Sequence, residues 1–171
     1  MLLGNSIIES ERLFFYKTGY NDLDEVLKIE GLEDNKKYIF SWSKERHRES
    51  INNEDELHIV IKRKDTKEII GYVLLAGLKG EDKSTEFRRI AIVQKGKGYG
   101  KESINLIKEL AFEKLKSHRL WLDVYEDNTK AINLYIKAGF TVEGMLRECK
   151  RVEDKYRSMM IMSILENEYF D

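Results

Sequence analysis

Proline is absent from the 171-residue chain, and cysteine occurs once, at Cys149. Without proline, the loops must turn at glycine, asparagine and aspartate. A single cysteine excludes an internal disulfide and favours a reducing compartment, so we interpret Cys149 as a structural residue. The three histidines, His47, His58 and His118, lack the spacing of metal ligands, and we expect no metal site.

Long apolar runs and an excess of one charge sign are also missing. No segment approaches the roughly 18 apolar residues of a membrane helix, and residues 1–5 lack the charged start and apolar core of a signal peptide. Lys and Arg total 30 against 31 Asp and Glu, whereas nucleic-acid binders usually carry a clear basic excess. We therefore expect a cytoplasmic protein that binds neither nucleic acid nor a membrane.

The composition is that of a folded chain, with 42% hydrophobic and 36% charged residues. No repeat or linker interrupts it, so we predict one domain over residues 1–171. Alternating and apolar segments predict strands at 12–17, 57–62, 68–75, 86–93, 120–125, 140–152 and 156–165. Helical spacing predicts helices over 23–29, 44–50, 101–115 and 129–138. The first strands read as an antiparallel meander, and the later strand–helix–strand unit predicts parallel pairing.

The stretch from Glu86 to Gly100 carries the clearest chemical signal. An apolar run is followed by glycines at 96, 98 and 100, and a helical pattern begins at once. Glycines let the backbone turn tightly and approach a ligand closely, and a helix N-terminus attracts phosphate. Lysines at 95, 97 and 101 add positive charge. The stretch therefore predicts a site for the pyrophosphate of a large cofactor.

A second motif follows downstream. Residues 128–140 read Asn-x-x-Ala-x-x-Leu-Tyr-x-Lys-x-Gly-Phe. This string, after Lys-Gly-Lys-Gly-Tyr-Gly at 95–100, resembles the GNAT superfamily of N-acetyltransferases, although Lys95 stands where that family usually has Arg or Gln. The segment from Phe140 to Ser158 is similar to the branch that contains ribosomal-protein alanine and spermidine acetyltransferases.

The resemblance implies the GNAT fold, an α/β (α+β) domain with a mixed, mostly antiparallel, twisted sheet of about seven strands and about four helices. Parallel strands would flank the cofactor cleft. It also implies acetyl-CoA (coenzyme A) as cofactor and direct transfer of acetyl to a primary amine of a polyamine, protein N-terminus or small molecule. A homodimer fits the family, while the sequence leaves the oligomeric state open. The residues expected to bind coenzyme A are Ile90, Ala91, Ile92, Lys95, Gly96, Lys97, Gly98, Tyr99, Gly100, Lys101, Asn128, Ala131 and Tyr135.

Two residues are expected to carry the chemistry. By the resemblance, Tyr135 protonates the departing thiolate, and a phenol of pKa near 10 is a suitable donor; its alternative is an aromatic ring packed on the inner face of its helix. Glu86 is expected to act as general base, directly or through water; its alternative is a strand-end carboxylate paired with Arg88 or Arg89. Asn128 also has the position of a helix cap.

Other interpretations remain open. Tyr38, Phe40 and Trp42 line the acceptor pocket or belong to the core. A dinucleotide oxidoreductase is a rival, but a Rossmann fingerprint would require a third glycine at Lys101 and a loop that opens the chain. A cofactor-binding sensor that has kept the fold and lost turnover is the second rival, and an intact Tyr135 argues against it.

Overall fold

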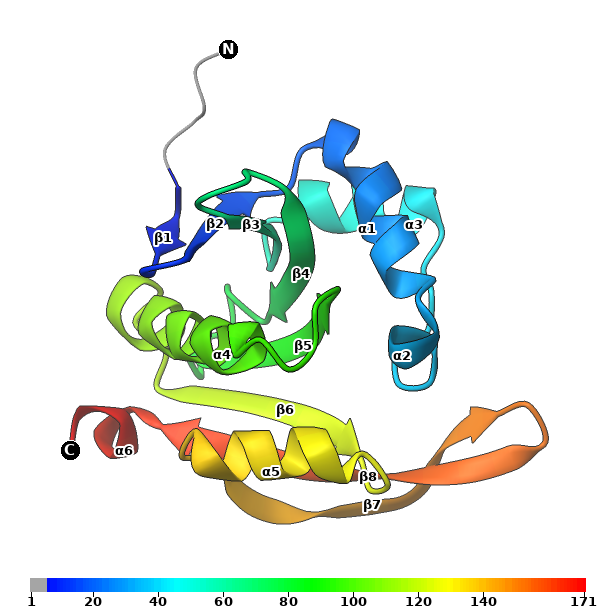
Figure 1. The fold of residues 1–171 in the computed structure, drawn as a ribbon. Helices are drawn as coiled ribbons and strands as arrows, with labels where there is room; N and C mark the ends of the chain where they lie inside the picture. Colours follow the sequence, from blue (N-terminus) through cyan, green and yellow to red (C-terminus); the bar gives the residue numbers. More distant parts are fainter. Residues whose placement is uncertain (1–5) are drawn as a thin grey trace.

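Figure 1 shows the chain as a computed structural model that describes residues 6–171. Residues 1–5, on which the expected lack of a signal peptide rests, lie outside the described residues. The strands are β1 (Ile8–Glu9), β2 (Leu13–Lys17), β3 (Glu56–Arg63), β4 (Ile69–Ala76), β5 (Ser84–Ile92), β6 (Arg119–Tyr125), β7 (Thr141–Val152) and β8 (Lys155–Leu165). The α-helices are α1 (Leu23–Glu30), α2 (Glu33–Lys36), α3 (Lys44–Asn52), α4 (Tyr99–Glu109), α5 (Thr129–Lys137) and α6 (Glu166–Phe170). A 3-10 turn at Tyr20–Asp22 precedes α1, and a π-helical stretch at Leu110–Lys114 extends α4.

The eight strands form one sheet in the order β1-β2-β3-β4-β5-β6-β8-β7. Strands β1 to β5 pair antiparallel in chain order, while β6 pairs parallel with β5. A parallel pair needs a crossover, which α4 supplies. The predicted mixed, mostly antiparallel sheet is confirmed. The structure adds one strand, the two-residue β1, and two short helices, α2 and α6, to the elements that were predicted.

Local signals fix the helix ends. The Ser43 hydroxyl accepts a hydrogen bond from the Arg46 amide at 3.1 Å, so α3 begins at Lys44, where the helix was predicted to start. Helix α1 ends at Gly31. Helix α5 ends just before Gly139, whose φ of +96° suits glycine and few other residues.

The helices cover the two faces of the sheet (Figure 1). On one face, α4 and α5 bury side chains such as Ile104, Ile107 and Ile132 against the central strands. On the other face, α1 buries Val26 and Ile29 against β3, β4 and β5. No helix of residues 6–171 is long and apolar enough to cross a membrane. The central strand β5 is therefore covered on both sides, and its separation from β6 decides where a ligand can enter.

A β-bulge in β5 sets the directions of its charged side chains. Phe87 pairs with Leu75 and Arg89 pairs with Leu74, which leaves Arg88 as the extra residue. Arg88 bonds to Glu86, and Arg89 bonds to the main chain of the segment that follows α2. The bulge thus allows two consecutive arginines to reach charged or polar groups of the same cavity.

Candidate active site

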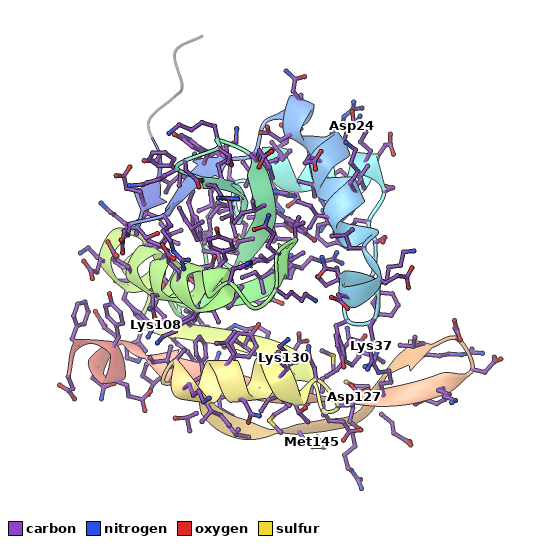
Figure 2. The ribbon with its side chains drawn as sticks, viewed as in Figure 1. Asp24, Lys37, Lys108, Asp127, Lys130 and Met145 are labelled. Atoms are coloured by element: carbon purple, nitrogen blue, oxygen red, sulfur yellow. The ribbon has the colours of Figure 1, made fainter. Side chains whose placement is uncertain are left out.

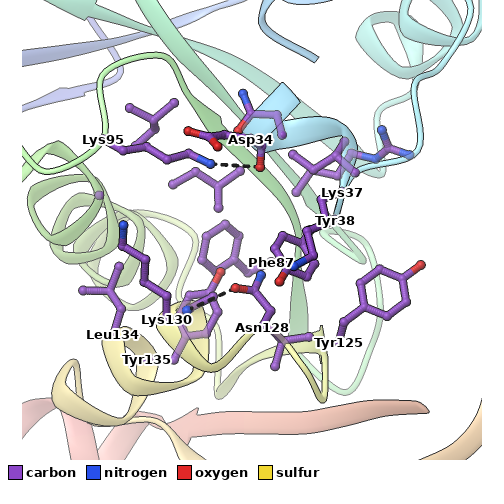
Figure 3. Close-up of a pocket in the computed structure, with 18 of the residues that line it drawn as sticks. Asp34, Lys37, Tyr38, Phe87, Lys95, Tyr125, Asn128, Lys130, Leu134 and Tyr135 are labelled. Atoms are coloured by element: carbon purple, nitrogen blue, oxygen red, sulfur yellow. Dashed lines mark hydrogen bonds between the residues drawn. The ribbon is translucent and has the colours of Figure 1, made fainter. Parts of the chain in front are cut away.

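A cavity of about 880 Å³ lies where β5 and β6 separate (Figure 3). Its walls come from α2 and the segment after it, from β5 and β6, from the loop at 93–98, and from the first turns of α4 and α5. Segments distant in the sequence therefore meet around one space. The loop forms one end of the cavity, which we call the donor end, and residues 37–43 form the other, which we call the acceptor end.

The separation of β5 and β6 leaves an open strand edge. The two strands pair only from Ser84 to Glu86 on β5, although β5 continues to Ile92. The Val93 amide donates to the Ile70 carbonyl on the β4 side. Because neighbouring peptide groups of a strand alternate in direction, the Ile92 amide faces the open edge. This edge has main-chain donors and acceptors for an extended substrate arm.

The expected strand residues are divided between two faces. Ile90 and Ile92 line the cavity. Ala91 is buried on the opposite face, in a cluster with Val60 and Tyr72. Only the main chain of Ala91 is available for the expected role.

The glycine loop has the form of an anion site. Gly96 and Gly98 have φ angles of +78° and +81°, in the region that favours glycine. Gly98 is the N-cap of α4 and brings no side-chain cap, so the first amides of this 11-residue helix have no partner within the helix. A Cβ added at Gly96 would meet no atom within 4 Å, which leaves the loop open to a ligand.

The basic residues of the loop have different surroundings. Lys101 lines the donor end together with Lys130 of α5. The Lys95 ammonium also lines the cavity, but it donates to the Asp34 carbonyl of α2 at 3.0 Å (Figure 3), and burial lowers its pKa. Lys97 and Tyr99 do not line the cavity: both lie against Arg12, through the carbonyl of Lys97 and the ring of Tyr99.

The start of α5 places two expected residues at the cavity. The Asn128 side-chain oxygen accepts from the Ala131 amide at 3.3 Å, as a helix cap does. The cap uses only the oxygen, so the Asn128 amide nitrogen keeps its two donors for a ligand. Both residues line the cavity, as does Gly100 at the start of α4.

Tyr135 has the packed ring that one interpretation expected, and it also lines the cavity. Its ring packs against Phe87 (Figure 3) and against Phe140, at centroid distances of 5.9 and 5.7 Å. Its hydroxyl has no hydrogen-bond partner within residues 6–171, and the residue lines the cavity. Burial and the nearby charge of Asp123 raise the Tyr135 pKa. The phenol therefore keeps its proton and has it available for a group in the cavity.

Glu86 lies at the acceptor end in an ion pair. Its Oε2 accepts from Arg88 Nε at 2.9 Å and from Arg88 Nη2 at 2.7 Å. Of the two pairings considered, the one with Arg88 is confirmed, while Arg89 pairs with Glu30. Both nitrogens of Arg88 thus contact the same Glu86 oxygen.

Asp123 is a site residue that the sequence reading missed. It is half-buried, lies on β6 two residues beyond the last parallel pair, and lines the cavity. Its carboxylate has no side-chain hydrogen-bond partner within residues 6–171, and burial and the charge of Glu86 raise its pKa. A signal was present in the sequence, since Asp123 is the one charged residue of the apolar segment 120–125.

Aromatic side chains surround the acceptor end. Tyr38, Phe40 and Trp42 line the cavity, as one of the two interpretations expected, and Phe40 is too exposed to belong to the core. Tyr125 at the end of β6 lines it as well, with the Arg157 guanidinium 3.6 Å from its ring centre. Such rings attract cations through their faces.

Residues 24–140 match the acetyltransferase (GNAT) family. A spermidine N(1)-acetyltransferase of Vibrio cholerae is 30% identical over 84% of this chain and 88% of its own length. The crystal structure of spermidine N-acetyltransferase from Vibrio cholerae in complex with CoA and spermine aligns with a TM-score of 0.85 at 26% identity, over 95% of this chain and 100% of that one. A dodecameric structure of that enzyme aligns with a TM-score of 0.81 at 26% identity, over 95% and 98% of the two chains.

Proposed function

The chain belongs to the acetyltransferase (GNAT) family and is an acetyl-CoA-dependent N-acetyltransferase, and from this premise we propose that its acceptor is a polyamine. The observation that carries the choice of a polyamine is the group of carboxylates, Glu86, Asp123 and Asp127, which lines one cavity together with aromatic rings. The chemistry rests on two unpartnered groups of that cavity, the Asp123 carboxylate and the Tyr135 hydroxyl. A proton acceptor and a proton donor in the same cavity suit transfer to an amine, since the amine loses a proton and the leaving thiolate gains one.

The donor end fits coenzyme A. The open amides at the start of α4 and the left-handed glycines suit a pyrophosphate, and Lys101 and Lys130 supply positive charge. The open edge of β5 at Ile90 and Ile92 suits an extended arm that carries amide groups. The Asn128 side-chain amide adds donors beside that edge. When bound, acetyl-CoA supplies an acetyl group activated as a thioester.

The two unpartnered groups divide the proton transfers. A primary amine is protonated near pH 7 and cannot attack until it loses a proton. Asp123 accepts that proton, and its raised pKa brings it closer to the working pH. Tyr135 donates its phenolic proton to the departing sulfur. The Ile92 main-chain amide at the open edge is the hydrogen-bond donor available to the carbonyl oxygen of the thioester.

Glu86 remains the alternative base. Its carboxylate also lines the cavity, but Arg88 already holds one of its oxygens. Both bonds from Arg88 go to Oε2, so Glu86 can contact an ammonium group through Oε1, whereas the Asp123 carboxylate has no side-chain hydrogen-bond partner within residues 6–171. We therefore assign Glu86 to binding of the acceptor and Asp123 to proton transfer.

A polyamine suits the acceptor end for two reasons. Carboxylates at Glu86, Asp123 and Asp127 line the cavity with the aromatic rings of residues 38–42. Carboxylates and aromatic faces both bind ammonium groups. The relatives named as spermidine acetyltransferases support the same class of acceptor.

A thiol-release assay with acetyl-CoA tests the proposal directly. We expect spermidine and spermine to raise the release of free thiol well above background, and mass spectrometry to find a singly acetylated polyamine. Release with an alanine-starting peptide alone would overturn the polyamine assignment. Tight binding of acetyl-CoA with no release for any amine would favour the non-catalytic sensor instead.

A cytoplasmic location is a further part of the proposal. Cys149 is exposed and has no disulfide partner within the described chain. An exposed free thiol suits a reducing compartment. Fractionation of cells that express the tagged protein would place it in the soluble cytoplasmic fraction if this is correct, and its recovery elsewhere would contradict it.

We also propose that copies of this chain assemble through β7, in a dimer or a larger assembly. The relative solved as a dodecamer supports assembly. Strand β7 ends the sheet, and its side chains Val142, Met145 and Leu146 are 44–48% exposed (Figure 2). An exposed edge strand with apolar side chains tends to acquire a partner. Sedimentation should find an oligomer that Met145→Glu with Leu146→Glu dissociates, whereas a monomeric parent protein would refute the idea.

A further inference from the structure

A buried carboxylate lies beneath the acceptor end and has no part in the chemistry above. Glu30, the last residue of α1, is fully buried. Its carboxylate accepts from the Tyr72 hydroxyl, from Arg89 Nη1 at 3.1 Å and from the Trp42 amide at 3.1 Å. Removal of a charge from water costs several kcal/mol, so a buried carboxylate persists only where its partners offset that cost.

Two histidines extend this network away from the cavity. The Thr18 hydroxyl lies 2.8 Å from His58 Nδ1, and His58 Nε2 lies 2.9 Å from His47 Nδ1. His47 Nε2 is 3.3 Å from Glu30 Oε1. A neutral imidazole has one donor and one acceptor, so the direction that suits all members runs from the Thr18 hydroxyl to the Glu30 carboxylate. Burial and the neighbouring His47 lower the pKa of His58 to about 4, which keeps it neutral.

The network stabilises the charged form of Glu30. Burial by itself raises the pKa of this carboxyl, but the adjacent His47 ring and the hydrogen bond from Tyr72 outweigh it and hold the pKa below its usual value. A charged Glu30 holds Arg89 more strongly than a neutral one does. The buried groups therefore act together on Arg89.

Arg89 connects Glu30 to the main chain and the Trp42 ring at the acceptor end. Its Nη1 also donates to the Phe40 carbonyl at 2.6 Å. Its guanidinium lies 4.0 Å from the ring centre of Trp42, and that of Arg46 lies 4.2 Å from the same ring. Two hydrogen bonds therefore hold residues 37–43, the segment at the acceptor end that we call the acceptor wall. Arg89 donates one to the Phe40 carbonyl, and the Trp42 main-chain amide donates the other to Glu30.

We infer that Glu30, acting through Arg89, is a positioning residue that sets the acceptor wall and thereby the fit of the amine. The inference rests on the proposed function for its kinetic consequence only. Within residues 6–171, no hydrogen bond of Glu30 reaches the glycine loop or α5, which form the donor end. The effect of Glu30 therefore falls on the amine and spares acetyl-CoA.

Steady-state kinetics of Glu30→Gln test the inference. The amide keeps the shape of the side chain and removes its charge. We expect KM for the amine to rise about tenfold while KM for acetyl-CoA stays within about twofold. Glu143→Gln is the matched control, because it removes a carboxylate paired with Arg119 outside the cavity. Equal rises in both KM values would overturn the inference.

A readout without turnover separates this idea from the proposed function. The chain has two tryptophans, so Trp121→Phe leaves Trp42, on the acceptor wall, as the only source of tryptophan fluorescence. In that background Glu30→Gln should shift Trp42 emission to the red and increase its quenching by acrylamide, while Glu143→Gln should change neither. This result would support the inference even if no polyamine were acetylated.

Arg89→Lys covers the case in which Glu30→Gln fails to fold. Lysine keeps the charge but lacks the planar guanidinium that lies over the Trp42 ring and places Nη1 between Glu30 and the Phe40 carbonyl. Arg89→Lys should therefore shift Trp42 emission to the red and increase its quenching by acrylamide, as Glu30→Gln should. A folded variant at either position with unchanged Trp42 quenching and unchanged amine KM would refute the inference.

Discussion

Two side chains without partners carry the proposed chemistry at the scale of single residues. Asp123 and Tyr135 border one cavity, and burial together with the charge of Asp123 raises the pKa of Tyr135. Buried polar groups usually have hydrogen-bond partners, and exceptions gather at functional sites. The presence of a partner also distinguishes the two carboxylates, because Arg88 bonds to Glu86 while Asp123 has no side-chain hydrogen-bond partner within residues 6–171.

Tyr135→Phe removes the phenolic proton and keeps the packed ring. We expect kcat to fall about 100-fold, which is the usual scale of general acid catalysis. Binding of coenzyme A, measured by calorimetry, should change little, because the ring still packs against Phe87 and Phe140. Turnover at the parent rate would refute the acid assignment.

Asp123→Asn and Glu86→Gln form a matched pair that identifies the base. Loss of the base should lower kcat about 100-fold for Asp123→Asn, and Glu86→Gln should mainly raise KM for the amine. The parent's kcat should decline as pH falls through the raised pKa of Asp123, because the protonated carboxyl accepts no proton. A larger loss of kcat in Glu86→Gln would reverse the two assignments.

At the scale of elements, the glycine loop depends on support from a distant hairpin. Arg12 lies between β1 and β2, and its Nη1 donates to the Lys97 carbonyl at 3.0 Å. Its Nε donates to Glu102 of α4 at 2.7 Å. Glycines give the loop few constraints of its own. The hairpin therefore holds both the loop and the first turn of α4.

Arg12→Ala should weaken the binding of coenzyme A. A hydrogen bond contributes about 0.5–1.5 kcal/mol net, so the loss of the bond to the loop predicts a roughly three- to tenfold higher Kd. Calorimetry with coenzyme A measures this without turnover. Lys79→Ala is the control, because it breaks an ion pair with Glu54 at the opposite end of β5. An equal loss in both variants would show that Arg12 acts only through general stability.

At the scale of the whole molecule, the buried His58 links stability to pH. The His58 pKa is about 4 in the fold against 6.5 for a free histidine. Between those values the unfolded chain binds a proton that the folded chain does not, so stability is complete above pH 6.5 and falls as the pH drops towards 4. The loss reaches about 3 kcal/mol, since one pKa unit corresponds to about 1.4 kcal/mol.

Urea denaturation at several pH values measures this loss. The parent should lose more stability between pH 7 and pH 4.5 than His58→Gln does, because the variant has no proton to gain at this site. His118→Gln is the control, since that histidine is exposed on the surface. Parallel stability curves for the parent and His58→Gln would contradict the assignment.

The turns and helix ends around the donor end were predictable from sequence because they are local. Gly96 and Gly98 adopt their turns, Asn128 caps the helix that follows it, and Gly139 ends that helix, all within a few residues of chain. The seven strands expected are present, because alternating and apolar patterns report burial directly. These features need no knowledge of how distant segments meet.

The acceptor side was decided by the tertiary structure. The bulge at Arg88 and the early separation of β5 from β6 depend on the pairing register, which no local pattern specifies. That separation opens the space beside Asp123. The network of Glu30 joins it to Arg89, 59 residues away along the chain. The sequence by itself determined a turn suited to a pyrophosphate, because glycine turns and helix caps are short-range, and its resemblance to the GNAT family implied coenzyme A. Only the packing of distant strands and helices decided which side chains line the acceptor end.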